Sequence, residues 1–544
     1  MATTATATEQ AIPAVEQQEE KITGYQWLAL LVLILGTFLA ILDNSLMNVA
    51  IPKLMAVFGS TSTEIEWVVT GYMLASAVVV PMGGFLSDRF GYKTTFLTTV
   101  VAFIIGSILC GLAWSDTSLI VFRIIQGLGG GFIMPVGMAM LYQIMPRSKI
   151  QVAMGIWGIA AMAAPAMGPT LSGYLVDNFS WRYLFYINVP IGIIAVVLGM
   201  IILKETPKRE GLKFDFVGSI LCMIVFSTLL LALTDGQSDG WSSLYIVSLF
   251  FISISSFILL IWVELGKENP IMDFRLFKNP IFTLSLAASS FVMISMQGGI
   301  YMMPIFMQNV SGLTPMQTGL VMMPQSIAMA FMMPIAGKLV SKYGVVPLGI
   351  AGLAIIGCTT LELHVLSQDT STHWISGLLI IRGIGIGLCM MPLSSAGMNT
   401  LPNHLIGRAS SVSNVIRNVM ASLGIAMLTS IMNNKTTQFG TRFNEAISTN
   451  TPAYADLQTN VVHRYMELGT DSSSAAGGVV GVLYGLVQKE ALTRAIADTL
   501  MLSAIPAFVA IVLVFFMRQK KKQKEVAAQE SAGADSQHHV MIEM

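Results

Sequence analysis

Charged residues are scarce in this sequence. Only 11% of the 544 residues are Asp, Glu, Lys or Arg, and 54% are hydrophobic, whereas about a quarter of a soluble domain is charged. So little charge cannot cover a soluble surface, which excludes a soluble enzyme and a disordered chain. The 30 basic residues balance the 30 acidic ones, so there is no net positive field that would bind nucleic acid.

Cysteine and histidine are also rare. The four cysteines all lie in apolar runs, so no disulfide framework is predicted. The six histidines are scattered without ligand spacing, which predicts no metal site. No G-x-x-x-x-G-K-S/T segment occurs, which argues against an ATP-driven pump. We therefore predict no cofactor and no enzymatic activity.

Long apolar runs dominate what is present. In hydrocarbon every backbone N–H and C=O group needs an internal partner, so a run of about 20 apolar residues predicts a helix. The sequence predicts an all-α membrane protein with 14 transmembrane helices, at 26–49, 66–86, 94–114, 117–141, 150–175, 183–203, 215–234, 244–264, 281–308, 315–337, 345–367, 374–397, 407–431 and 493–517. Segment 432–492 is mostly polar, and its short apolar stretch 475–487 predicts an interfacial or re-entrant hairpin.

The basic residues indicate the orientation of these helices. Lys and Arg gather on alternate connections and in the tail 518–544, and only Lys53 and Arg182 fall on the short connections of the other side. Because cytoplasmic loops carry the excess of Lys and Arg, we expect a multi-pass protein of the plasma (inner) membrane with both termini in the cytoplasm.

An internal repeat divides the chain. Residues 81–91 recur without a gap as 334–344, and 119–135 resemble 378–392. The copies are eight spans apart, which predicts two six-helix bundles separated by an inserted helix pair. The predicted parts are a disordered N-terminus 1–25, a first bundle 26–203, the inserted pair 204–264, a second bundle 265–517 with the outer loop 432–492, and a basic tail 518–544.

Several motifs carry a family resemblance. The segment Gly84–Lys93 resembles the span 2–3 signature of the major facilitator superfamily, and Arg123 with Gln126 resembles its span 4 motif. Segments 42–52 and 181–192 are similar to those of fourteen-span drug:proton antiporters. The span 5 antiporter motif is matched by Gly155, Gly168, Pro169 and Gly173. The chain is thus identified as a member of the EmrB/QacA-type multidrug efflux branch, with the fold of that superfamily.

The resemblance implies proton-driven export of lipophilic small molecules by alternating access. The alternative is a dedicated exporter or flippase of one lipid, siderophore or endogenous metabolite on the same fold. The expected partners are lipophilic substrates, protons and the lipid bilayer. A monomer is expected, with a periplasmic adaptor if the organism has two membranes.

Asp43 is the one acidic residue well inside a predicted span, and Arg123 is expected at a similar depth. We place Asp43 about 10 Å and Arg123 about 9 Å below the outer ends of their helices. A carboxyl group buried beside a cation stays ionised, whereas one buried alone favours protonation. An Asp43–Arg123 pair that forms and breaks would therefore take up and release protons. The alternative is a static clamp with Arg123 or Asn48.

Three other charges lie in the predicted spans. Glu362 is a candidate second proton site, although its place near a helix end also lets it reach interfacial water. Arg417 is either a counter-charge in the central cavity or a tie between helices. Arg382 is the repeat's equivalent of Arg123 and is expected to be structural.

The span 2–3 turn and a methionine cluster complete the candidates. The predicted gate comprises Gly84, Asp88, Arg89, Gly91 and Lys93; the resemblance implies that Asp88 caps the start of span 13 near Gly407, and the alternative is a solvated turn. The candidate substrate pocket comprises Met302, Met303, Met322, Met323 and Gln126. Thioethers adapt to many ligands, although methionine at helical spacing is also ordinary packing.

Overall fold

The computed structural model describes residues 22–517 except 147–148, 207, 209–213, 269, 403–404, 447–451 and 468–471. Most of the predicted N-terminus 1–25 and the tail 518–544 lie outside the described residues. Within the described ranges every regular element is a helix, which confirms the all-α prediction. Thirteen helices there are long and apolar enough to cross a membrane. The 29-residue helix α7 (Ile150–Asn178) packs among them and makes fourteen.

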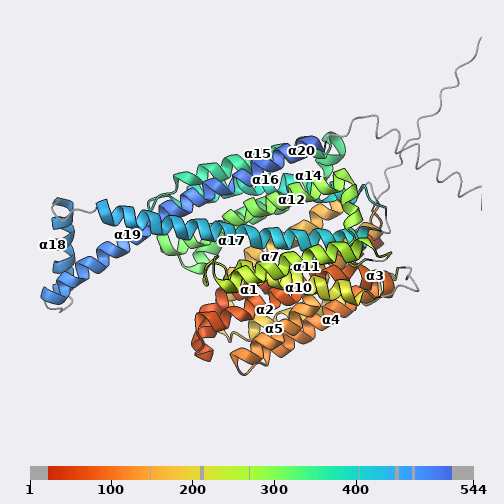
Figure 1. Ribbon diagram of the computed structural model, residues 1–544, viewed down its shortest axis with the longest axis horizontal. Coiled ribbons are helices and arrows are strands. Elements are labelled where there is room, and N and C mark those ends of the chain that lie inside the picture. The colour runs from red at the N-terminus through yellow and green to blue at the C-terminus, as the bar shows by residue number, and fades with distance from the viewer. Residues whose placement is uncertain are drawn as a thin grey trace, which may run out of the picture.

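The helices fall into two bundles and an inserted pair (Figure 1). The first bundle contains α1 (Gly24–Phe58), α2 (Ser62–Val79), η1 (Val80–Met82), α3 (Gly83–Phe90), α4 (Tyr92–Gly111), α5 (Asp116–Gly130), α6 (Ile133–Ile144), α7, α8 (Tyr183–Tyr186) and α9 (Asn188–Ile202). The inserted pair is α10 (Phe216–Asp235) and α11 (Leu244–Leu265). The second bundle contains η2 (Phe274–Lys278), α12 (Pro280–Gln297), η3 (Gly298–Met302), α13 (Met303–Ile305), η4 (Phe306–Val310), α14 (Pro315–Tyr343), α15 (Val345–Glu362), η5 (Leu363–Val365), α16 (Thr372–Met398), α17 (Ile406–Ala446), α18 (Pro452–Glu467), α19 (Ser472–Ser503) and α20 (Ile505–Phe516).

The two copies of the repeat fold alike. Gly91 ends α3 with φ +91° and Gly344 ends α14 with φ +84°. Each glycine N–H donates to the carbonyl four residues earlier, at 2.9 Å to Ser87 and 2.8 Å to Val340. This backbone conformation is one that only glycine adopts readily. The glycine shared by the two copies therefore sets the same sharp turn in each bundle.

The two bundles meet chiefly along α7 and α14. We call the end of the molecule where α1 begins and α20 ends the near end, and the opposite end the far end (Figure 1). On the near side, a Cβ built on Gly155 of α7 would lie 2.7 Å from the carbonyl oxygen of Met333 on α14. Ser410 of α17 also donates 3.0 Å to the carbonyl of Pro135 on α6. The bundles are therefore in close contact at the near end.

The inserted pair packs against both bundles. Helix α10 contacts α2 of the first bundle and α17 of the second. The side chain of Asp215 caps α10 by accepting 2.7 Å from the Gly218 N–H, and it forms an ion pair with Lys267 beyond the end of α11. These two contacts of Asp215 connect the start of α10 to the end of α11 at the near end of the molecule.

The predicted re-entrant or interfacial hairpin at 475–487 was wrong, because that stretch belongs to the continuous helix α19. Helix α17 also runs on to Ala446, 15 residues or about 22 Å past the predicted end of its span. The two helices pack along each other and project from the far end, with α18 packed on α19 at the tip (Figure 1). Lys435 of α17 and Asp498 of α19 form an ion pair of 2.6 Å near the root of this projection. Packing between α17 and α19, together with this ion pair, thus stabilises the mostly polar segment 432–492 as helices.

Candidate functional site

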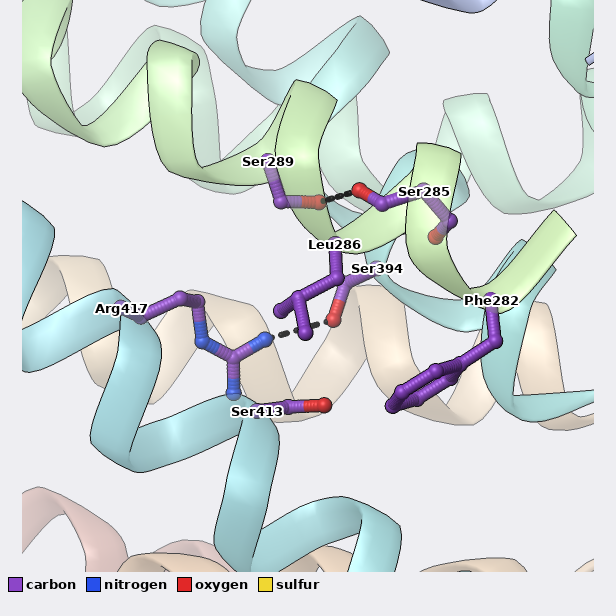
Figure 2. A pocket seen from close by; sticks show the side chains of 7 residues that line it. All are labelled: Phe282, Ser285, Leu286, Ser289, Ser394, Ser413 and Arg417. Atoms are coloured by element: carbon purple, nitrogen blue, oxygen red, sulfur yellow. Dashed lines mark hydrogen bonds between the residues drawn. The ribbon is translucent and has the colours of Figure 1, made fainter. Parts of the chain in front are cut away.

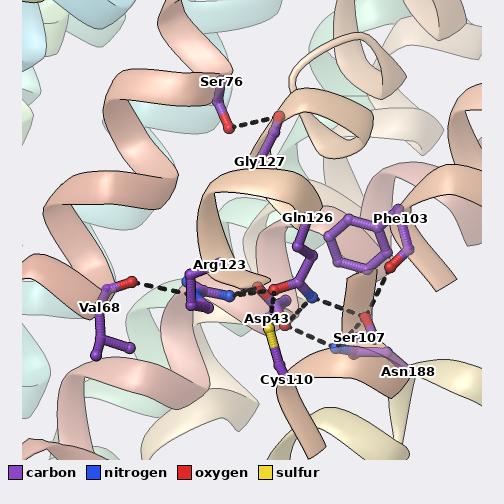
Figure 3. Close-up of polar contacts among 10 residues, drawn as sticks. All are labelled: Asp43, Val68, Ser76, Phe103, Ser107, Cys110, Arg123, Gln126, Gly127 and Asn188. Atoms are coloured by element: carbon purple, nitrogen blue, oxygen red, sulfur yellow. Dashed lines mark hydrogen bonds and ion pairs between the residues drawn. The ribbon is translucent and has the colours of Figure 1, made fainter. Parts of the chain in front are cut away.

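Asp43 and Arg123 form a buried ion pair in the first bundle. The Arg123 Nη1 atom lies 2.5 Å from Asp43 Oδ2, and the two residues are 0% and 1% exposed. Helix α1 continues past the predicted end of its span to Phe58, so Asp43 lies 15 residues before the end of the helix. The two side chains nevertheless meet, on α1 and α5 (Figure 3).

Two amides hold the other oxygen of Asp43. Gln126 Nε2 donates to Asp43 Oδ1 at 3.0 Å, and Asn188 Nδ2 of α9 donates at 2.7 Å (Figure 3). Gln126 also accepts 2.7 Å from Arg123 and donates 2.7 Å to Ser107 Oγ of α4. Such a network keeps the carboxylate hydrogen-bonded on both oxygens, which a buried charge requires.

Arg123 is fixed from its other side by α2. Its Nε donates 3.0 Å to the Val68 carbonyl, and its guanidinium lies 4.2 Å from the ring centre of Tyr72, a cation–π geometry. Helices α1, α2, α4, α5 and α9 therefore all contribute to one site, and all belong to the first bundle. The pair is therefore closed to solvent in this conformation.

The span 2–3 turn lies against the start of α17 through Gly84, and a cap on α17 by Asp88 stays a prediction. A Cβ built on Gly84 would lie 3.1 Å from the Gly407 carbonyl, and the Gly84 N–H donates 3.0 Å to Ser411 Oγ. Asp88 is buried and accepts 3.3 Å from Tyr92 Oη. A solvated turn does not describe this contact, because glycine lets the two helix backbones touch.

The two basic residues of the motif lie at the rim of this contact. Lys93 Nζ donates 2.8 Å to the Met200 carbonyl of α9, and its backbone N–H donates 3.1 Å to Glu205. Arg89 lies 5.7 Å from the ring centre of Phe90. These contacts hold the turn to the last helix of its own bundle.

The span 5 glycines make different contacts. Gly155 touches α14, whereas a Cβ on Gly168 would lie 2.0 Å from Ser45 Oγ of α1. A Cβ on Gly173 would meet nothing within 4 Å, and the Pro169 side chain lies outside the described residues. Helix α7 therefore lies against the second bundle through Gly155 and against α1, two residues from Asp43, through Gly168.

Arg382 has the burial of Arg123 but a different environment. It is 0% exposed, its Nη2 donates 2.7 Å to the Ser295 carbonyl, and its Nε donates 3.2 Å to Thr360 Oγ1. A Cβ on Gly299 would lie 1.5 Å from Nη1, so the guanidinium packs on bare backbone. Within the described ranges it has no carboxylate partner.

Arg417 points into a small pocket between α12, α16 and α17 (Figure 2). Its guanidinium donates 2.8 Å to Ser394 Oγ and 3.1 Å to Asn414 Oδ1, and it lies 3.7 Å from Met138 Sδ of the first bundle. Arg417 therefore faces the space where the two bundles meet.

The remaining candidates do not gather into one site. Met302 and Met303 are fully buried in the core of the second bundle, and Met322 packs against that core while Met323 is half-buried elsewhere on α14. Gln126 is not beside them, because it holds Asp43 in the first bundle. Glu362 is exposed at the end of α15. Asn48 of the alternative clamp lies among residues whose side chains are not described.

The sequence argument missed Asn188 and Ser107 as ligands of the ion-pair network. Asn188 lies within the motif 181–192, and a buried amide in an apolar helix was the signal that could have found it. Ser107 carries no such signal, because serine is common in membrane helices and only helix rotation turns it toward Gln126.

Two six-helix repeats, an inserted pair and buried charges in the spans define a multi-pass membrane transporter. The Major Facilitator Superfamily matches residues 33–425, and the chain belongs to that family. It is 35% identical to the uncharacterized MFS-type transporter YhcA of Bacillus subtilis, over 91% of this chain and 93% of that protein. It is 30% identical to the multidrug export protein EmrB of Escherichia coli, over 79% of this chain and 85% of that protein.

A solved structure confirms the fold. The crystal structure of the human organic anion transporter MFSD10 superimposes with a TM-score of 0.59, covering 90% of this chain and 99% of the other, at 10% identity. At that identity the likeness concerns the fold alone. The family match confirms the predicted family, and the superposition confirms the predicted fold.

Proposed function

We propose that this protein exports lipophilic small molecules in exchange for protons, by alternating access, with both termini in the cytoplasm. The observation that carries the proposal is the sealed Asp43–Arg123 pair. An ionisable pair inside the membrane is expensive and generally functional. Relatives such as EmrB, named as a multidrug exporter, support the direction and substrate class.

Asp43 is the proton site in this proposal. A proton that binds the Asp43 carboxylate cancels the negative charge that holds Arg123. The protonated and ionised forms of Asp43 therefore favour different helix positions. Loss of the proton restores the pair of 2.5 Å. The amides of Gln126 and Asn188 position the carboxylate in the ionised state.

The contacts of α1 with α7 offer the route from Asp43 to the interface between bundles. Ser172 Oγ of α7 donates 2.7 Å to the carbonyl of Leu46, three residues after Asp43. Further along α7, Gly155 lies on Met333 of the second bundle. A shift of α1 on protonation therefore moves the helix that forms the main seam, which is the two-state element that coupling requires.

Proteoliposomes with an acidic lumen and an internal pH dye test the proposal. Tetraphenylphosphonium, a neutral dye and a lipophilic acid are each added outside the vesicles. An exchanger moves the substrate into the lumen and protons out of it, so adding a substrate should raise the luminal pH. Asp43→Asn should abolish substrate-triggered proton flux. Asp369→Asn is the matched control, since Asp369 is an exposed acid in the connection after η5 and makes the same chemical change outside the ion-pair network.

Two results would overturn parts of the proposal. If Asp43→Asn keeps the substrate-triggered proton flux of the wild type, Asp43 is not the proton site. Substrate movement that needs ATP hydrolysis, or that runs equally without a pH gradient, removes proton exchange itself. Protein-free liposomes correct for acids that carry protons through lipid unaided.

A further inference from the structure

Arg417 carries a positive charge that the described part of the chain does not neutralise. Its hydrogen-bond acceptors are a hydroxyl and an amide oxygen, with a thioether at 3.7 Å, and none of them is charged. No acid forms an ion pair with it within the described ranges. It lies 11 residues into α17, about 16 Å along the helix, close to the middle of the bilayer. An uncompensated guanidinium at that depth is costly, which indicates a ligand.

Hydroxyl groups surround this charge. The pocket is lined on α12 by Ser285 and Ser289, on α16 by Ser394, and on α17 by Ser413 (Figure 2). Ser394 accepts a bond from Arg417 and keeps its own O–H to donate. Ser413 is buried, and its side-chain hydroxyl makes no hydrogen bond to another described residue. Ser413 and Arg417 lie four residues apart and so share one face of α17.

A second unused donor lies on α6 of the first bundle, one helical turn from the Met138 that Arg417 reaches. Tyr142 of α6 is buried, and its hydroxyl has no hydrogen-bond partner among the described residues. Tyr142 lies four residues after Met138, one turn along the same face of α6, and the Met138 sulfur is 3.7 Å from Arg417. Guanidinium N–H groups and the hydroxyls of Ser394, Ser413 and Tyr142 are all able to donate, and together they suit a ligand that accepts several hydrogen bonds and carries negative charge.

The rest of the pocket is apolar and small. Phe282 and Leu286 of α12 form one wall (Figure 2). The cavity in this conformation has a volume of about 10 Å³, which is room for about one water molecule. This conformation therefore leaves no room for a ligand, and both the acidic group and the body of a ligand need the space that opens when the bundles separate.

We propose that Arg417, with Ser394 and Ser413, binds the carboxylate of a lipophilic organic acid, so that lipophilic acids are a substrate class of this transporter. This inference rests on the proposed export function and names its substrate. The methionine cluster of the second bundle is not needed for it. A purely structural Arg417 would tie α16, α17 and α6 together but would not distinguish an acid from a neutral molecule of the same shape.

Three pyrene probes that differ only in their end group test the inference: 1-pyrenebutyrate, 1-pyrenebutanol and 4-(1-pyrenyl)butyltrimethylammonium. Binding to purified full-length protein is measured by energy transfer from its tryptophans to pyrene. The wild type should bind the acid about tenfold tighter than the alcohol, as a charge-assisted hydrogen-bonded contact predicts. Arg417→Gln should reduce binding of the acid to that of the alcohol and leave the alcohol within about twofold. Arg417→Lys should retain part of the preference.

Serine variants refine the test without removing a charge. Ser413→Ala and Ser394→Ala should each weaken acid binding about threefold to tenfold. Ser290→Ala is the matched control, because Ser290 is buried next to Ser289 on α12 but does not line the pocket. If Arg417→Gln does not give a folded, monodisperse protein, the serine variants decide the question alone.

The outcomes separate this inference from the proposed function. Equal affinity for acid and alcohol in the wild type, or an acid preference that survives Arg417→Gln, overturns the inference even if cations are exchanged for protons. Asp43→Asn should keep the acid preference, because Asp43 lies in a different site. If the preference holds but the acid moves without proton exchange, the carboxylate site stands and proton coupling fails.

Discussion

The two bundles contain equivalent arginines in different surroundings. Arg123 and Arg382 are both fully buried on helices that the repeat relates. Arg123 meets the carboxylate of Asp43 at 2.5 Å, whereas Arg382 meets a backbone carbonyl and the hydroxyl of Thr360. The repeat thus has the cation in both bundles, but among the described residues only the first bundle pairs it with an acid.

This difference suggests a division of labour between the bundles. The first bundle holds a neutral ion pair that a proton can break. The second holds Arg382 on bare backbone at Gly299 and Arg417 at a small pocket, neither with an acid partner among the described residues. We infer that the first bundle handles the proton and that the second provides charge for the substrate.

The largest expected effect comes from removing each arginine in turn. Arg123→Gln should lower the free energy of unfolding by about 3–5 kcal/mol at pH 8, because it leaves Asp43 buried without its cation. Arg382→Gln should cost about 1–2 kcal/mol, since lost hydrogen bonds are offset by removing an unpaired charge. Denaturant titration of both variants in one detergent measures the difference.

A double variant controls this comparison. Asp43→Asn with Arg123→Gln should recover most of the stability, because neither member of the pair remains charged. Equal losses for Arg123→Gln and Arg382→Gln, or a double variant no better than the single one, would mean that the two sites do not differ as the structure indicates.

An intermediate effect is expected at the paired turns. Gly91→Ala and Gly344→Ala should each cost about 1–3 kcal/mol, because both glycines have a backbone conformation that alanine resists. A Cβ on Gly91 would also lie 2.1 Å from Glu205, whereas one on Gly344 meets nothing within 4 Å. Gly91→Ala should therefore be the more damaging in thermal unfolding. The reverse order would contradict the tighter packing of the first turn.

The smallest effect concerns the hydroxyls near each arginine. Ser107→Ala removes an acceptor of the Asp43 network, and Thr360→Val removes the acceptor of Arg382 Nε. Each should cost about 1 kcal/mol, but only Ser107→Ala should also slow substrate-triggered proton flux. A flux change of the same size in Thr360→Val would show that proton handling extends into the second bundle.

The sequence by itself determined the helices, their number and the two-bundle plan. Hydrocarbon leaves the backbone no partner but itself, so apolar runs of sufficient length become helices whatever their neighbours. The repeat of 81–91 at 334–344 predicted the turns that Gly91 and Gly344 make. The scarcity of buried charge singled out Asp43 and Arg123 before their contact was known.

Only the tertiary structure decided which polar side chains meet and which polar segments become helical. Ser107 and Asn188 join Asp43 because α4 and α9 are rotated toward α1, and rotation depends on packing with neighbours rather than on local sequence. The far-end projection is helical because α17 and α19 cover each other, which no composition window detects. The pocket at Arg417 exists because three helices and the opposite bundle leave its charge facing a shared space.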